Sequence, residues 1–243
     1  MERKVILTEV AVGYGQRVVV DGITATLEPG ELVCLLGRNG TGKSTLLRTL
    51  AGFQPYLSGR ITVDDKLLEG IGRKELAHTI GIVLTKQSEL QDMTVEELVA
   101  LGRSPYTGFF GNLTSEDSKI VEEAMEIVGI GKLKGRRLMT MSDGERQKAM
   151  IAKTLAQKTP VILLDEPTAF LDYQSRRELF HLLKHLAHEE EKTILMTTHD
   201  VQFALRLADK IWMVEGEGME TGKLSIHTTP LPKDMIRKYG FTE

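Results

Sequence analysis

The sequence predicts an α/β fold with a mostly parallel β-sheet. Short, largely apolar runs at residues 31–36 and 161–164 have the length and composition of buried strands. Segments with helix-compatible patterns follow them, at residues 44–50 and 173–190. Strands that alternate with helices form parallel sheets covered on both faces, and such sheets bind ligands beyond the carboxyl ends of their strands.

The other elements differ between the N-terminal and the central part of the chain. Residues 88–158 are predicted to be mainly helical. Thr94 and Glu97 have capping-box spacing for a helix that runs to about Leu101, and residues 115–128 have helical periodicity. An antiparallel β section and a helical insertion therefore accompany the parallel core. Two hairpins are predicted, one from the strands at residues 4–12 and 17–27 and one from those at 60–63 and 66–68. Further strands are predicted at residues 80–84, 193–198 and 210–214.

Residues 37–44 have the sequence GRNGTGKS, which fits the phosphate-binding loop called Walker A. Glycines allow successive backbone N–H groups to surround phosphate oxygens, and the helix behind the loop adds about half a positive charge. In this motif Lys43 neutralises the β- and γ-phosphates, and the Ser44 hydroxyl holds Mg²⁺. The alternative is an ordinary glycine-rich turn. The candidate residues for nucleotide binding are Gly37, Asn39, Gly40, Thr41, Gly42, Lys43, Ser44 and Thr45.

Two adjacent carboxylates, Asp165 and Glu166, follow the apolar run at residues 161–164, which is the Walker B pattern. An Asp at a strand end can reach a Mg²⁺ ion that Ser44 also holds, and Glu166 can accept a proton from an attacking water. An acidic turn that caps the next helix is the alternative. The candidate residues at or just beyond predicted strand ends, which should converge on one site, are Gly37, Gln87, Asp165 and His199.

The composition is that of an ordinary globular protein, with 41% hydrophobic and 27% charged residues. A net charge of −3 without a basic run argues against nonspecific nucleic-acid binding. The one cysteine, Cys34, lies in an apolar run and is expected to be buried, which fits a reducing cytosol. No stretch of about eighteen apolar residues occurs, so any role at a membrane is expected to depend on a partner.

With these motifs, the chain resembles the ATPase subunits of ABC transporters over nearly its full length. Residues 141–145, MSDGE, are similar to the signature motif LSGGQ of that family. Ser142 and Glu145 have capping-box spacing, and a helix N-terminus with a serine hydroxyl and the Gly144 amide is also an anion site. In the family this site faces the γ-phosphate bound to the other subunit. The sequence departs from the motif at Asp143, which replaces a glycine, and at Glu145, which replaces a glutamine.

The resemblance also implies roles for single residues. Tyr14 matches the aromatic residue that stacks on adenine, and Gln87 matches the glutamine that senses Mg²⁺ and the attacking water and links to the permease. His199 matches the switch histidine that touches the γ-phosphate, and residues 169–172 match the loop that crosses the dimer interface. The alternatives are a turn tyrosine, a surface glutamine and a structural histidine. By resemblance, the catalytic residues are Lys43, Gln87, Glu166 and His199, and the metal ligands are Ser44, Gln87 and Asp165.

The resemblance implies a P-loop NTPase core in a single ABC ATPase domain over residues 1–243. Residues 1–87 and 159–243 then form the N-terminal antiparallel β subdomain and the α/β core, and residues 88–158 form the inserted helical subdomain. Segments at 100–106, 108–111 and 233–239 are similar to the importer subfamily for iron–siderophore complexes, haem and cobalamin. The implied function is hydrolysis of ATP, with Mg²⁺, that powers uptake through a separate permease.

The implied partners are a second copy of the chain, a polytopic membrane permease and, indirectly, a periplasmic or surface solute-binding protein. The chain is expected at the cytoplasmic face of the inner membrane. Nucleic acid is not expected as a partner. Two alternatives are a soluble ABC ATPase of DNA repair, translation or iron–sulfur assembly, and an export ATPase. Tyr106, Phe109 and Phe110 either border a groove for a permease helix within residues 88–113 or pack their loop against its own domain.

Overall fold

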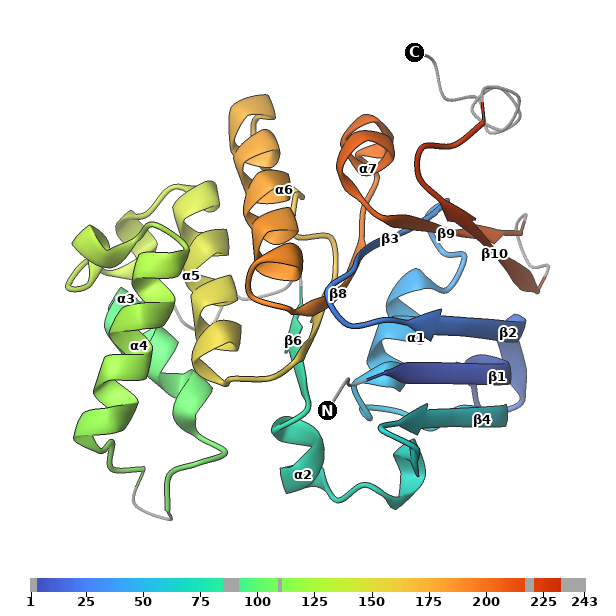
Figure 1. Ribbon diagram of the computed structural model, residues 1–243, viewed down its shortest axis with the longest axis horizontal. Helices are drawn as coiled ribbons and strands as arrows, with labels where there is room; N and C mark the ends of the chain where they lie inside the picture. The colour runs from blue at the N-terminus through green and yellow to red at the C-terminus, as the bar shows by residue number, and fades with distance from the viewer. Residues whose placement is uncertain (1–3, 85–91, 109–110, 217–220, 233–243) are drawn as a thin grey trace.

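The computed structural model describes residues 4–84, 92–108, 111–216 and 221–232. In these residues one sheet of 10 strands has the order β5-β4-β1-β2-β10-β9-β3-β8-β7-β6 (Figure 1). Its strands are β1 (Val5–Tyr14), β2 (Arg17–Leu27), β3 (Leu32–Gly37), β4 (Ser58–Val63), β5 (Lys66–Leu67), β6 (Ile80–Val83), β7 (Val161–Leu164), β8 (Thr193–Thr197), β9 (Lys210–Glu215) and β10 (Gly222–Thr228). The helices are α1 (Lys43–Leu50), α2 (Arg73–Ala77), α3 (Val95–Ala100), α4 (Ser115–Ile127), α5 (Asp143–Ala156), α6 (Tyr173–His188) and α7 (Val201–Leu207).

The predicted division between a parallel and an antiparallel part is confirmed. Strand β3 pairs in parallel with β8 and β9, and β7 pairs in parallel with β8 and β6. Strand β1 is antiparallel to β2, and β4 is antiparallel to β5, as the two hairpin patterns predicted. Strand β1 also pairs with β4, which was not predicted. The carboxyl ends of β3, β7 and β8 therefore lie at one edge of the sheet, where the sequence placed the candidate site.

The central strand β3 shows how alternate side chains build two cores. Leu32, Cys34 and Leu36 belong to the apolar core that α6 and α7 cover, whereas Val33 and Leu35 belong to the core beneath α1. Successive side chains of a strand point to opposite faces, so a continuous apolar run requires cover on both. Burial raises the pKa of the Cys34 thiol, and the expectation of a buried cysteine is confirmed.

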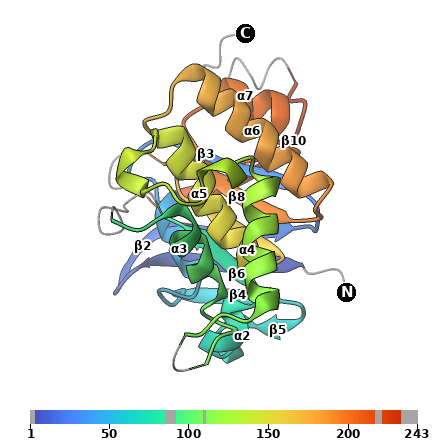
Figure 2. The ribbon, with the colours of Figure 1, turned by 90° about the vertical axis from the view of Figure 1, so that its left-hand side faces the viewer.

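Helices α3, α4 and α5 form a group at one end of the sheet, drawn on the left in Figure 1 and nearest the viewer in Figure 2. Capping boxes open all three helices, at Thr94, Thr114 and Ser142. Two of these boxes were predicted. The box at Thr114 was not predicted, because Asp117 occupies the position where the usual pattern has Glu or Gln.

The guanidinium of Arg103 ties this helical group together from inside. Its Nε lies 2.8 Å from Asp117 Oδ1 on α4, and its Nη1 donates to the carbonyl of Ala156, the last residue of α5, at 2.7 Å. Hydrogen bonds from Thr114, with the Arg103 bond, lower the pKa of Asp117 to about 2. A buried ion pair with such additional hydrogen bonds fixes the relative positions of the elements that carry it.

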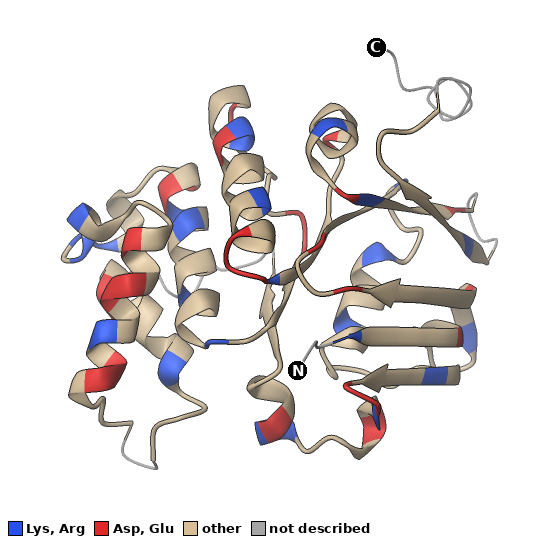
Figure 3. Cartoon of the chain, viewed as in Figure 1, with Lys and Arg blue, Asp and Glu red and all other residues tan. Residues whose placement is uncertain are grey.

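Among the described strands and α-helices, two were not predicted. Strand β10 extends the sheet between β9 and β2, and α2 is a single short turn of five residues before β6. The segment 233–239, which is similar to the importer subfamily, lies outside the described residues. Figure 3 shows acidic and basic residues interspersed along both the strands and the helical group, in agreement with the absence of a basic run in the sequence.

Candidate functional site

The glycine-rich loop connects β3 to α1, as the motif requires. At Gly37, which has φ of 153°, a Cβ atom would lie 2.8 Å from the carbonyl oxygen of Val214. At Gly42, the residue that caps α1, φ is 102° and a Cβ atom would lie 2.7 Å from side-chain carbons of both Val19 and Val20. Glycine is therefore required at both positions by conformation and by space.

The Lys43 side chain folds back over this loop. Its Nζ donates to the carbonyl oxygens of Gly37 at 2.7 Å and of Arg38 at 2.9 Å. Burial lowers the pKa of the Lys43 ammonium, while the carboxylates of Glu166 and Asp165 favour its charged form. The ammonium thus lies inside the loop that the motif assigns to phosphates. Phosphate oxygens can take the place of these two carbonyl oxygens as acceptors of its hydrogen bonds.

Asp165 lies at the end of β7, beside the first turn of α1. Its Oδ1 accepts hydrogen bonds from Ser44 Oγ and from Thr197 Oγ1, each at 2.9 Å. The sequence predicted that Ser44 and Asp165 come together. The described residues contain no cluster of three or more His, Cys, Asp and Glu side chains that could hold a metal ion alone. A hydroxyl and a carboxylate are ligands that Mg²⁺ accepts together with substrate phosphate oxygens, so this pair fits that ion.

Glu166 and His199 form the other half of the site. The Nε2 atom of His199 lies 2.9 Å from Glu166 Oε1. Glu166 has φ of 49°, a conformation uncommon for non-glycine residues. Its backbone N–H donates to Thr197 Oγ1 at 2.8 Å, which fixes the backbone that carries this carboxylate. A partly exposed carboxylate with a neighbouring imidazole can accept a proton from water.

Tyr14 lies at the edge of the loop. Its hydroxyl is 3.2 Å from Thr45 Oγ1 in α1, and its side chain is 52% exposed. The ring is therefore anchored at one end, and it retains a free surface on which another planar group could stack. Gln87, also expected at the site, is outside the described residues.

Ser142 and Gly144 do not belong to this cluster of side chains. They open α5 in the helical group, whereas α1 lies beside the strands (Figure 1). The Ser142 hydroxyl accepts from the Glu145 N–H at 3.2 Å, and a Cβ atom on Gly144 would lie 3.1 Å from Ser175 Oγ of α6. The segment is thus a well-formed helix start packed against α6.

The two acidic departures from the signature motif each lie beside an arginine. Asp143 pairs with Arg146 at 3.3 Å, and Glu145 pairs with Arg136 at 3.4 Å. Both pairs are partly exposed, so they contribute little to stability. They do offset the negative charge that Asp143 and Glu145 bring to this helix start.

Thr197 was missed by the sequence-based analysis, because a threonine at the end of a strand carries no motif. Its hydroxyl links the two carboxylate residues: it donates to Asp165 and accepts from the Glu166 N–H.

We expect Thr197→Val, which keeps the branched shape but removes the hydroxyl, to lower the rate of ATP hydrolysis by about 10- to 100-fold. The variant deprives Asp165 of a donor and leaves a backbone N–H without its acceptor. Thr193→Val, at the other end of β8, is the matched control. Steady-state hydrolysis measures the effect, and equal rates for the two variants would contradict this positioning role.

Comparisons with known proteins agree with this geometry. The family model described as ABC transporter matches residues 20–169. An uncharacterised ABC transporter ATP-binding protein of Methanocaldococcus jannaschii is 44% identical over 84% of this chain and 71% of its own length. The ferric enterobactin transport ATP-binding protein FepC of Escherichia coli is 37% identical over 84% of this chain and 75% of its own length. The iron(3+)-hydroxamate import ATP-binding protein FhuC of Bacillus subtilis is 36% identical over 82% of this chain and 74% of its own length.

A solved structure gives the same result for the fold. A metal-chelate type ABC transporter in an inward-facing conformation superposes with a TM-score of 0.80 at 26% identity, over 93% of this chain and 84% of that one. The chain belongs to the ATP-binding proteins of the ABC transporter family, and it binds and hydrolyses ATP. In the part of the chain that is described, no helix has the length and apolar character needed to cross a membrane.

Proposed function

We propose that this chain powers the uptake of an iron chelate (a ferric siderophore or haem) or of cobalamin through a separate permease. The observation that carries this proposal is the similarity to relatives named for ferric enterobactin transport and iron(3+)-hydroxamate import. The chain then works as a peripheral subunit at the cytoplasmic face of the membrane. It forms one ABC ATPase domain in which residues 88–158 are the helical subdomain.

ATP binds over the glycine-rich loop. Lys43 exchanges its carbonyl partners for the β- and γ-phosphates, and the loop N–H groups and the N-terminus of α1 face the phosphate oxygens. The half-exposed ring of Tyr14 stacks on adenine. Ser44 and Asp165, with Gln87, hold Mg²⁺, which supplies positive charge to the phosphate oxygens.

Glu166 is the general base. It accepts a proton from water as the water oxygen attacks the γ-phosphorus, while the bond to the bridging oxygen breaks and ADP leaves. His199 lies within hydrogen-bond distance of this carboxylate and orients it towards the γ-phosphate. Thr197 positions Glu166 and Asp165 through one hydroxyl.

Two copies of the chain pair head to tail. Ser142 and Gly144 lie on a different part of the fold from Lys43, so a second copy is required for both segments to contact one ATP. Exposed aromatic side chains support a surface between copies: Phe170, in the segment before α6, is 85% exposed, and Tyr173, the first residue of α6, is 67% exposed. ATP binding then joins the copies, and hydrolysis releases them.

A hollow of about 530 Å³ beside α3 is the contact for the permease. Exposed apolar side chains, Leu101 and Leu113, line it. It accepts a short helix of the permease. Phe109 and Phe110 are outside the described residues. Tyr106 packs on its own domain, because its hydroxyl donates to the carbonyl of Gln157 and its ring contacts His78.

Removal of this chain from its host is expected to abolish uptake of one of the three proposed cargoes, measured with labelled iron chelates and cobalamin. The unaltered chain should restore uptake, and a Glu166→Gln chain should not. Leu101→Glu changes the permease contact only, so it should fail to restore uptake although the isolated subunit hydrolyses ATP normally.

Unchanged uptake of all three cargoes in the deleted strain would contradict the proposal. Impaired efflux of a lipid or drug would then favour the export alternative, and impaired DNA repair, translation or iron–sulfur assembly would favour the soluble alternative.

A further inference from the structure

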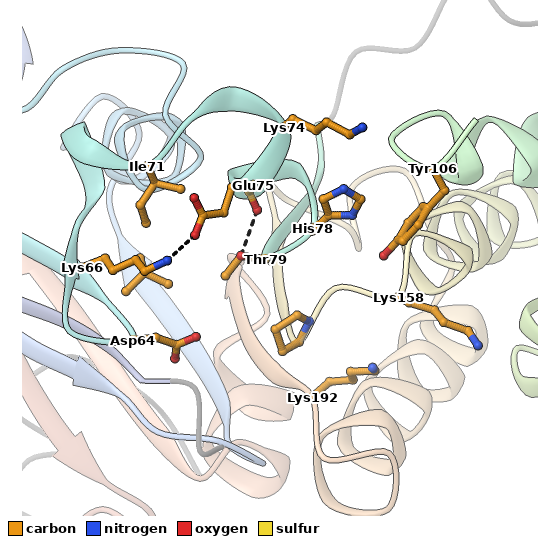
Figure 4. Close-up of a pocket in the computed structure, with 12 residues that line it drawn as sticks. Asp64, Lys66, Ile71, Lys74, Glu75, His78, Thr79, Tyr106, Lys158 and Lys192 are labelled. Atoms are coloured by element: carbon orange, nitrogen blue, oxygen red, sulfur yellow. Dashed lines mark hydrogen bonds and ion pairs between the residues drawn. The ribbon is translucent and has the colours of Figure 1, made fainter. Parts of the chain in front are cut away.

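A second hollow, of about 1190 Å³, lies between α2 and the segments that precede β7 and β8 (Figure 4). Thr79, Pro160 and Lys192 line it, and each directly precedes a parallel strand: β6, β7 and β8. It therefore lies at the amino ends of these strands, whereas the ATP site lies at their carboxyl ends. None of the residues proposed for ATP binding or hydrolysis lines it.

The walls of this hollow differ in charge. On one side, Lys66 is neutralised by Glu75 at 2.6 Å, and Asp64 lies nearby (Figure 4). Lys74, next to Glu75 on α2, and two more lysines on the facing side, Lys158 and Lys192, also line the hollow. Within the described parts of the chain, none of these last three lysines forms an ion pair or a side-chain hydrogen bond.

Two of these ammonium groups repel each other. Burial lowers the pKa of Lys192; Glu190 opposes this effect, and the positive charge of Lys158 adds to it. Lys158 itself follows the last turn of α5 with φ of 54°, a left-handed conformation that glycine usually supplies at this position. The backbone thus holds a lysine beside another lysine in a conformation that favours glycine, and backbone strain of this kind is concentrated at functional sites.

Tyr106, which also lines the hollow, is held by several contacts. The Tyr106 ring meets His78 edge-on, with ring centroids 4.4 Å apart, and the Arg103 guanidinium carbon lies 3.8 Å from the centroid of the same ring. The Tyr106 hydroxyl donates to the Gln157 carbonyl, next to Lys158. These contacts fix the position of Tyr106, which lines the hollow, and tie it to the backbone next to Lys158.

We propose that this hollow binds a phosphate-bearing anion, which Lys74, Lys158 and Lys192 hold from three different elements of the fold. A phosphate group carries up to two charges and several acceptor oxygens, which match separate ammonium groups better than a single carboxylate does. The phosphate belongs either to a soluble compound or to a lipid headgroup. The hollow adjoins the proposed permease contact, because Ser104 and Thr107 line that contact and Tyr106 lines the hollow.

The test uses the full chain with its nucleotide site saturated with Mg²⁺–ADP. Calorimetric titration with inorganic pyrophosphate tests the soluble source. Co-sedimentation with phosphatidylcholine vesicles, with and without phosphatidic acid, tests the lipid source. Binding in only one arm identifies the source, and binding in neither arm overturns the proposal.

Lys158→Gly and Lys192→Gln should each weaken binding by about tenfold, because each removes a charged hydrogen bond. Lys132→Gln, an exposed lysine of the helical group, is the control and should change nothing. Lys158→Gly also removes the left-handed strain, so its Tm should not fall and a folding defect cannot explain its lost binding. ATP hydrolysis without the anion should be unchanged in all three variants. Equal affinity of Lys158→Gly, Lys192→Gln and the unaltered chain would place any bound anion elsewhere and overturn the proposal.

Discussion

A Glu166→Gln chain should bind ATP normally and hydrolyse it about 10²- to 10⁴-fold more slowly than the unaltered chain. The amide keeps the size of the carboxylate and its hydrogen bond to His199, 2.9 Å away, but it cannot accept a proton from water. Because ATP is bound and not consumed, the variant should accumulate as an ATP-bound pair. Single-turnover hydrolysis measures the rate, and light scattering at saturating ATP measures the mass.

The control for this experiment is Glu122→Gln, which removes an exposed carboxylate on α4 and should leave both readouts unchanged. A monomeric Glu166→Gln chain would show only that the permease is needed to hold the pair, and the measurement would then be repeated on the complex. Normal hydrolysis by Glu166→Gln would refute its role as the base.

A Lys43→Ala chain should lose at least about 10²-fold in hydrolysis, and its affinity for ATP should fall as well. The ammonium is the one lysine charge inside the described loop, and in the described residues it donates hydrogen bonds to the carbonyls of Gly37 and Arg38. Substitution removes the charge that faces the β- and γ-phosphates without removing the glycines that shape the loop.

Titration with a fluorescent ATP analogue measures the affinity, and phosphate release measures the rate. Lys132→Gln again controls for a general loss of positive charge. Unfolding followed by circular dichroism should show an intact fold, because Lys43 contacts only its own loop through hydrogen bonds. Retained turnover in a folded Lys43→Ala chain would exclude the assignment of this loop.

The sequence predicts the parallel core and the pair of Ser44 and Asp165 for a physical reason. Both signals are local: apolar runs with turn residues at their ends, and a loop whose glycines are required by backbone geometry. Since parallel strands end at one edge, local signals also bring distant residues together. Ser44 and Asp165 are far apart in the chain, but these signals predict that they lie in one site.

The elements that were missed depend on non-local contacts. Strand β10 offers only two apolar residues, Leu224 and Ile226, and it is defined by its pairing with β9 and β2. Helix α2 is too short to show a period. Thr197 acts through two hydrogen bonds that exist only after β7 and β8 are paired. None of these contacts can be read from spacing along the chain.

The Arg103 ion pair has a mechanical consequence for the helical group. Its guanidinium holds the C-terminal end of α5, and Ser142 caps the N-terminal end of the same helix. Helix α5 has 14 residues, so its ends are about 21 Å apart. Leu101, two residues before Arg103, lines the proposed permease contact. If the permease binds at the proposed contact, α5 offers a direct connection from that contact to the signature segment at its other end.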